Sequence, residues 1–345
     1  MFRLTRSARL SFAAILFSSL SLLTACGADL GTPPIGHSDS ATTGDATDTT
    51  AGSTDTTGST GNTTDVADDT PTEGVVEEAA PGETPDVTTA DTTAPKTYAG
   101  APSSYFDLTH WYLTLPSADA VSTVQLNSGY QYADVFYTDP STGGMVFRCP
   151  NIAGHTPNST HSRTELREVR NPAISSMSDP SNNFTTALGG TMKAALRVDR
   201  VGVTGTNGGT TYVGNVVIGQ IHGPSTELVR LHYVKLPGEA TGRVFAAMEN
   251  MAGHGVHSPD LVSNANGDGL KLGERFTYVI HLAGTTLTVY LSRANHATVK
   301  YTTTIDSGYV GKNLYFKAGV YNQDNGGDPA DYAQATFFKL AHTHP

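Results

Sequence analysis

Cysteine and tryptophan are scarce in this chain of 345 residues, which has two cysteines and one tryptophan. We expect no disulfide within the folded region, because Cys26 ends an N-terminal apolar segment and leaves Cys149 as the one other cysteine. Burial in a hydrophobic core is the ordinary role for such a residue, and a catalytic thiol is the alternative. The chain is therefore not a disulfide-stapled domain.

Apolar runs long enough to cross a membrane are also missing. The apolar segment 10–23 follows three arginines and is shorter than the roughly 20 residues that a membrane-spanning helix needs. We interpret residues 1–25 as a secretory signal peptide. The string Leu23-Thr24-Ala25-Cys26 resembles the lipobox of bacterial lipoproteins, which implies an acylated Cys26 and a lipid anchor at the outer membrane or cell surface. Ordinary cleavage near Ala25, with secretion, is the alternative.

Aromatic residues are absent from residues 28–97, where 20 threonines are interleaved with Asp, Gly, Ala and Pro. Such a segment cannot bury enough apolar surface to offset its conformational entropy, so we expect residues 26–98 to form a disordered linker. Residues 28–98 hold 14 Asp and Glu against one Lys, and therefore account for the net charge of −11. The remaining 99–345 has 17 basic and 18 acidic residues, a balance that argues against a nucleic-acid partner.

Helical periodicity is largely absent from residues 99–345, apart from one helical turn that we expect around residues 130–136. Short alternating segments separated by Gly, Asn, Asp and Pro predict an all-β fold, a two-sheet antiparallel sandwich or jelly roll. The strands expected from this pattern cover residues 111–115, 191–198, 212–221, 228–235, 243–248, 276–282, 286–292, 300–305, 314–321 and 334–340.

Polar and apolar residues alternate in three segments, 163–167, 220–222 and 315–323. In extended strands this places the apolar side chains in the core and the polar ones on one face. The polar residues are Arg163, Glu165, Arg167, Gln220, His222, Lys317, Tyr321 and Gln323. If the three strands are neighbours, this face carries several cations and one carboxylate, and suits an anion that is to be deprotonated.

Removing a proton from carbon beside a carboxylate requires that the carboxylate be neutralised first, a task for which Arg163 and Gln220 are suited. His222 has the pKa range of a base near neutrality, and Tyr321 can donate a proton to a leaving oxygen. Taken singly, these residues also fit a surface ion-pair ladder or a half-exposed strand. Their joint occurrence on one predicted face favours a catalytic site.

The three segments resemble the signature motifs of the alginate lyases of polysaccharide lyase family seven, and the likeness covers roughly residues 103–344. The resemblance implies a jelly roll whose concave sheet forms a groove for alginate, with residues 99–345 as a catalytic domain. It implies that Arg163 and Gln220 neutralise a uronate carboxylate, that His222 abstracts the C5 proton and that Tyr321 protonates the bridging oxygen.

The same resemblance assigns substrate binding to Arg167, Lys317 and Gln323, and makes Glu165 the residue that holds the arginines in place. It implies that the chemistry requires no metal, and we expect no cofactor. We expect the protein to be a monomer. The isoleucine at position 221 goes with activity on guluronate or mixed blocks in that family.

Three other functions fit parts of the sequence. A glycoside hydrolase needs two carboxylates, and the predicted polar face offers Glu165 alone. A non-catalytic carbohydrate-binding module would use the same groove, and a lyase could act on another polyuronate such as glucuronan. No metal site is expected, because His254 and His257 lie in a Gly-rich loop and His342 and His344 resemble tail residues.

Overall fold

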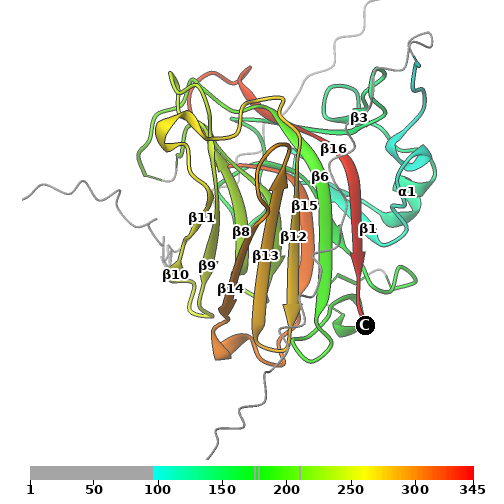
Figure 1. Ribbon diagram of the computed structural model, residues 1–345. Coiled ribbons are helices and arrows are strands. Elements are labelled where there is room, and N and C mark those ends of the chain that lie inside the picture. Colours follow the sequence, from blue (N-terminus) through cyan, green and yellow to red (C-terminus); the bar gives the residue numbers. More distant parts are fainter. Residues whose placement is uncertain (1–95, 175, 178, 210) are drawn as a thin grey trace, which may run out of the picture. The chain divides into compact units, whose positions relative to one another are not determined.

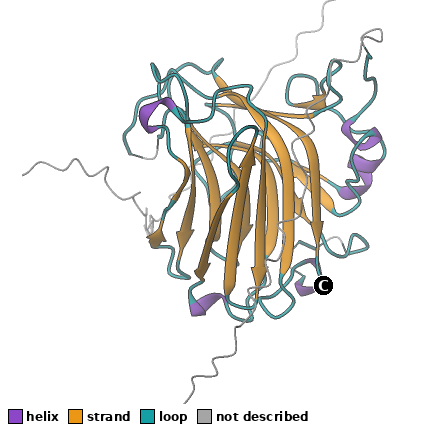
Figure 2. Cartoon of the chain, in the orientation of Figure 1, coloured by secondary structure: helices purple, strands orange, loops and turns teal. Residues whose placement is uncertain are grey.

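Two antiparallel β-sheets dominate the computed structural model, which describes residues 96–345 except 175, 178 and 210 (Figures 1 and 2). The proposed signal peptide, Cys26 and nearly all of the predicted linker lie outside these residues. Within the described part, no helix has the length and apolar character needed to cross a membrane. The predicted all-β sandwich with jelly-roll architecture is confirmed.

The first sheet carries all three of the alternating motifs. Its hydrogen-bonded order is β10 (Gly255–His257), β9 (Arg243–Glu249), β8 (Glu227–Val234), β7 (Asn215–His222), β15 (Tyr315–Asn322), β5 (Arg163–Glu168), β1 (Trp111–Thr114) and β2 (Ala120–Val121), with β11 (Asp260–Val262) also paired to β9.

The second sheet packs against the first. Its order is β14 (Val299–Thr304), β13 (Thr286–Arg293), β12 (Phe276–Ala283), β6 (Gly190–Arg200), β16 (Tyr332–Thr343), β4 (Met145–Pro150) and β3 (Phe136–Thr138). Five short helices lie in the connections: α1 (Thr123–Asn127), η1 (Pro102–Ser104), η2 (Pro180–Asn182), η3 (Ala265–Gly267) and η4 (Ser307–Tyr309).

The core lies between the two sheets and follows the predicted alternation. Leu166, Ile221, Phe316 and Val320 are fully buried in one hydrophobic cluster, on the opposite side of their strands from the polar motif residues. Cys149 is also fully buried, and burial raises the pKa of its thiol. Its predicted role as a core residue is confirmed.

The predicted helical turn at residues 130–136 is wrong. The helix of this region is α1, where Ser122 and Gln125 form a capping box, and residues 130–136 instead form turns that lead into β3. The Ser-x-x-Gln spacing at residues 122–125 is the sequence signal for the start of this helix. Strand β4 also escaped prediction, because it is buried along most of its length and therefore lacks a clear alternation.

Candidate active site

The three motif strands are neighbours, in the order β7, β15, β5. Lys317 in the middle strand is aligned with Arg167 on one side and with Gln220 on the other. Tyr321 is aligned with Arg163 in β5, and Tyr315 with His222 in β7. Residues separated by up to 158 positions in the chain thus occupy one small area of the sheet, as the shared parity of the motifs predicted.

Glu165 is the centre of the polar cluster. Its carboxylate lies 2.5 Å from the Lys317 ammonium and 3.3 Å from Nη1 of Arg163, and it accepts a hydrogen bond from the Gln220 amide. Because all four side chains are buried, the single carboxylate offsets two cations that would otherwise be costly to desolvate. Glu165 therefore fixes the positions of the three groups expected to meet a substrate carboxylate.

A glycine opposite Glu165 lets β15 approach β5 closely. Gly319 in β15 has φ of +143°, and a Cβ atom there would come within 2.6 Å of the Thr164 carbonyl oxygen. The close approach of the two backbones explains why the motif has glycine here.

Arg167 has a separate set of partners, so the prediction that Glu165 holds both arginines is only half right. Its guanidinium donates to the Asn183 side chain at 2.7 Å and to the Met177 carbonyl at 2.8 Å, and it stacks on the Tyr315 ring at 3.8 Å. Asn183 and Met177 lie in the connection between β5 and β6, and the alternation within a strand does not reveal where that connection runs.

Tyr321 is bracketed by a cation and a hydroxyl. The Arg163 guanidinium lies 3.8 Å from the centroid of its ring, and its phenol oxygen is hydrogen-bonded to the Ser159 hydroxyl at 2.9 Å. His161 contacts the same ring edge-on, with the centroids 6.0 Å apart. The phenol therefore has a fixed direction and a polar partner.

The His222 ring has a fixed orientation. Its Nδ1 lies 2.6 Å from the Gly223 carbonyl oxygen, which can only accept, so Nδ1 carries the proton and Nε2 is free to take one. Burial lowers the pKa of His222 below its ordinary value of 6.5; the Glu227 carboxylate opposes this shift, and the Lys317 cation acts in the same direction as burial. The ring also stacks on Tyr315 with a centroid distance of 5.0 Å. A neutral, fixed imidazole is the result.

Lys317 has an unusual acidity for a lysine. Burial lowers its pKa to about 8, and the neighbouring Arg163 adds to this effect while Glu165 opposes it. The ammonium therefore loses its charge within a pH range in which an exposed lysine would keep it.

Gln323 lies just beyond the end of β15, and its side chain does not join the hydrogen bonds around Glu165. Its side-chain amide donates to the Tyr321 carbonyl at 3.4 Å, and its backbone pairs with Asn215 and Tyr212. These contacts support the strand end that carries Tyr321. The predicted role of Gln323 in substrate binding stays a prediction.

Glu227 and Arg230 in β8 extend the site and were missed in the sequence. A register shift between β7 and β8 aligns Glu227 with His222, and its Oε1 lies 3.7 Å from Nε2 of His222. Burial raises the pKa of Glu227. The nearby Arg230 and His222 have the opposite and larger effect, and bring the pKa of Glu227 to about 2. The face thus holds more than the one carboxylate that was predicted. The alternation Val229, Arg230, Leu231 was the available signal.

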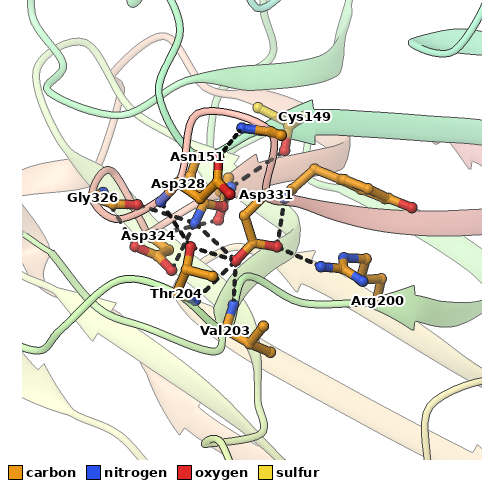
Figure 3. Close-up of polar contacts among 12 residues, drawn as sticks. Cys149, Asn151, Arg200, Val203, Thr204, Asp324, Gly326, Asp328 and Asp331 are labelled. Carbon is orange, nitrogen blue, oxygen red and sulfur yellow. Dashed lines mark hydrogen bonds and ion pairs between the residues drawn. The ribbon is translucent and has the colours of Figure 1, made fainter.

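A buried polar network anchors the chain just after Tyr321 (Figure 3). The Asn322 amide donates to the Asn151 side chain at 2.9 Å, and the Asn151 amide donates to Asp324 at 2.9 Å. Figure 3 shows the Asp331 carboxylate at the centre of this network, where it accepts from the backbone N–H of Val203 at 2.7 Å. The network ties the connection after β15 to the loop after β6.

Asp331 also forms a salt bridge with Arg200 in this network. Nη2 of Arg200 lies 2.7 Å from Asp331 Oδ1. Burial raises the pKa of Asp331, but the bond from Arg200 and those from the Val203 and Thr204 backbone outweigh burial and lower this pKa to about 2. The carboxylate is therefore charged in the folded protein, and its contacts tie the start of β16 to the loop after β6.

An antiparallel sandwich that presents an imidazole, a phenol and buried cationic side chains on one sheet has the arrangement expected of a polysaccharide lyase. A family model described as alginate lyase matches residues 106–344. The chain belongs to the alginate lyase family, and the resemblance noted in the sequence is confirmed.

Individual relatives agree with this assignment. An alginate lyase of Klebsiella pneumoniae is 37% identical over 284 residues, which cover 71% of this chain and 91% of that protein. The crystal structure of the alginate lyase from Klebsiella pneumoniae has a TM-score of 0.66 at 35% identity, and the match covers 71% of this chain and 99% of that one.

Two further solved structures are similar. An alginate lyase from Pseudomonas aeruginosa matches with a TM-score of 0.56 at 29% identity, over 69% of this chain and 100% of that one. A family 7 alginate lyase in complex with a substrate, GGMG, matches with a TM-score of 0.58 at 26% identity, over 72% of this chain and 97% of its own.

Proposed function

We propose that this alginate lyase cleaves its polymer by β-elimination at the cluster centred on Glu165. The observation that carries the proposal is the meeting of Arg163, Gln220 and Lys317 around one carboxylate, beside an oriented His222 and Tyr321. Two cations and an amide donor suit a uronate carboxylate, whose charge must be neutralised before a proton can leave the adjacent carbon.

The proton transfers follow from the orientation of the two remaining groups. Nε2 of His222 takes the C5 proton of the uronate, the C4–O bond breaks, and Tyr321 gives its proton to the departing oxygen. The electron pair of the C5–H bond becomes the C4–C5 double bond, so the product is an unsaturated uronate at the new non-reducing end. Where proton and leaving group lie on the same side of the ring, as in mannuronate, Tyr321 performs both transfers.

Arg167 is assigned to binding a neighbouring sugar carboxylate. Its guanidinium is already held by Asn183 and stacked on Tyr315, so little side-chain entropy remains to be lost when substrate binds. Lys317, which lies within the cluster around Glu165, is also assigned to binding a sugar carboxylate.

The direct test is the ultraviolet absorbance of the unsaturated product while the purified protein acts on polymannuronate, polyguluronate, pectin and hyaluronan. We expect absorbance to rise with at least one alginate block and to stay flat with the two controls. A rise with another polyuronate such as glucuronan, and none with alginate, would reassign the substrate. No rise with any polymer, from protein that binds alginate, would favour a non-catalytic carbohydrate-binding module.

We also propose that the enzyme prefers guluronate or mixed blocks, because isoleucine occupies position 221 between Gln220 and His222. Ile221 is fully buried on the core side of β7 and makes no contact with the polar face, so its effect on substrate choice would be indirect. Comparing kcat/KM on the two homopolymers, with Ile221→Val as the variant, tests this preference. Equal values for both polymers, or a preference for mannuronate, would refute it.

The pH dependence of activity follows from His222 and Lys317, two site residues whose pKa values differ from their ordinary values. His222 must be neutral to act as a base, and its pKa lies below 6.5, so activity should fall only in acid below that value. Lys317 must be charged to bind a carboxylate, and its pKa of about 8 predicts a loss of substrate affinity above that pH. We expect a bell-shaped profile of kcat/KM. The Lys317→Arg variant should shift the alkaline limb upward, and an unchanged limb would show that another group titrates there.

We further propose that the protein is exported and anchored by lipid at Cys26, with the acidic segment to residue 98 as a tether and the lyase acting as a monomer. The basic residues, apolar segment and Leu-Thr-Ala-Cys string support this proposal. Mass spectrometry of the mature N-terminus should find diacylglycerol on Cys26 and none in Cys26→Ser. An unmodified N-terminus near residue 26 would indicate simple secretion instead.

A further inference from the structure

A second cluster of titratable side chains lies on the core side of β5, where the two sheets meet. It consists of Glu168, the last residue of β5, with His342 near the end of β16 and His344 just after it. One carboxylate oxygen and one nitrogen of each imidazole lie within 4.8 Å of one another. The two histidines were predicted to be tail residues, and this is wrong: their side chains are 12% and 11% exposed, and Glu168 is fully buried.

Hydrogen bonds outside the cluster fix which atoms face inward. Nδ1 of His344 lies 2.6 Å from the Gly189 carbonyl oxygen, which can only accept, so Nδ1 carries a proton and Nε2 points at Glu168. Oε2 of Glu168 accepts the backbone N–H of Phe316 at 3.0 Å, which leaves Oε1 facing both imidazoles. A backbone carbonyl on the far nitrogen is the usual support of a metal-binding histidine.

We propose that Glu168, His342 and His344 bind a divalent transition-metal cation, with zinc as the expected ion. Two imidazoles and one carboxylate, with a position left for water, form a zinc ligand set, whereas calcium and magnesium take oxygen ligands. Tetrahedral zinc with bonds of about 2.0–2.2 Å requires ligand atoms about 3.3 Å apart.

The existing distances are near that requirement. Oε1 of Glu168 is 3.5 Å from Nε2 of His342 and 2.5 Å from Nε2 of His344, so a shift of about 0.8 Å in the second pair would admit the ion. Trp111 and Phe184 border the site, with centroids 4.8 Å from those of His342 and His344 respectively. This apolar surround limits competition by water for the ion.

The metal would cross-link the two sheets. Glu168 belongs to the same strand as Arg163 but points to the opposite side, whereas both histidines come from the end of β16 in the other sheet. The site should therefore stabilise the C-terminal end of the chain and leave the elimination chemistry unaffected. The alternative for the same contacts is an ion pair between protonated His344 and Glu168.

The two explanations differ in metal content. Purified protein stripped with a chelator and dialysed against zinc chloride should retain one zinc per chain, measured by atomic emission. Its Tm should rise by about 5–10 °C when free zinc is a hundredfold above the Kd. Cobalt should give the intense visible absorption of a tetrahedral site, which does not depend on any variant folding.

Variants locate the bound ion. His344→Gln and His342→Gln should each lose the stoichiometric zinc and the Tm rise, while His296→Gln, which alters an exposed histidine in another loop, should keep both. If His344→Gln does not fold, the partly exposed His342→Gln and the cobalt spectrum decide. The proposal is overturned if the protein retains no zinc, if its Tm does not change when zinc is added, or if the His342→Gln variant still retains zinc.

Discussion

Replacing Tyr321 by phenylalanine should lower kcat on alginate by about 10²–10⁴-fold, the usual contribution of a positioned acid or base. The ring would remain under the Arg163 guanidinium, 3.8 Å away, so the carboxylate-binding groups should keep their positions. Only the hydroxyl and its bond to Ser159 are lost, at a cost of about 1 kcal/mol in stability. Product absorbance gives kcat, and titration calorimetry of an alginate oligomer gives the affinity.

The matched control is Tyr290→Phe, which removes a phenol hydroxyl from β13 in the other sheet and should leave kcat unchanged. On a polymer in which the proton and the leaving group lie on opposite sides of the ring, His222→Asn should lower kcat as much as Tyr321→Phe does. On polymannuronate, His222→Asn should lower kcat less. If Tyr321→Phe keeps more than half of the activity on both blocks, the assignment of Tyr321 as the proton donor is wrong.

Replacing Glu165 by glutamine should destabilise the protein by about 3–5 kcal/mol, because Lys317 and Arg163 would then be buried without their shared carboxylate. This corresponds to a fall in Tm of about 6–20 °C for a domain of this size. Activity should disappear as well, since the same carboxylate positions the groups that meet the substrate. Differential scanning calorimetry measures the first effect at pH 7, where Lys317 is charged.

Two comparisons separate this effect from a general loss of charge. Asp260→Asn removes a carboxylate from an exposed pair with Arg243, both side chains being 39% exposed, and should change the stability by less than about 1 kcal/mol. The double variant Glu165→Gln with Lys317→Met should recover part of the lost stability, because no unpaired ammonium remains at that position. If Glu165→Gln melts at the same temperature as Asp260→Asn, the cluster does not depend on its carboxylate.

The alternation of side chains was enough to predict which face each motif residue occupies. Side chains in a strand point to opposite sides with a period of two, a local property that any few residues of the sequence contain. Leu166, Ile221 and Phe316 accordingly lie in the core, and Glu165, Gln220 and Lys317 on the polar face. The all-β class and most strand positions followed from the same local information, whereas the burial of Cys149 was predicted from its residue type.

The tertiary structure alone decided which strands are neighbours and what fills the space between them. The Gln220 amide meets a carboxylate 55 residues away, and His344 meets one 176 residues away. A register shift brings Glu227 beside His222, and the connection after β5 supplies the partners of Arg167. Such contacts depend on strand order, register and loop paths, which are set by packing over the whole domain, whereas the period of a strand is set by its own backbone.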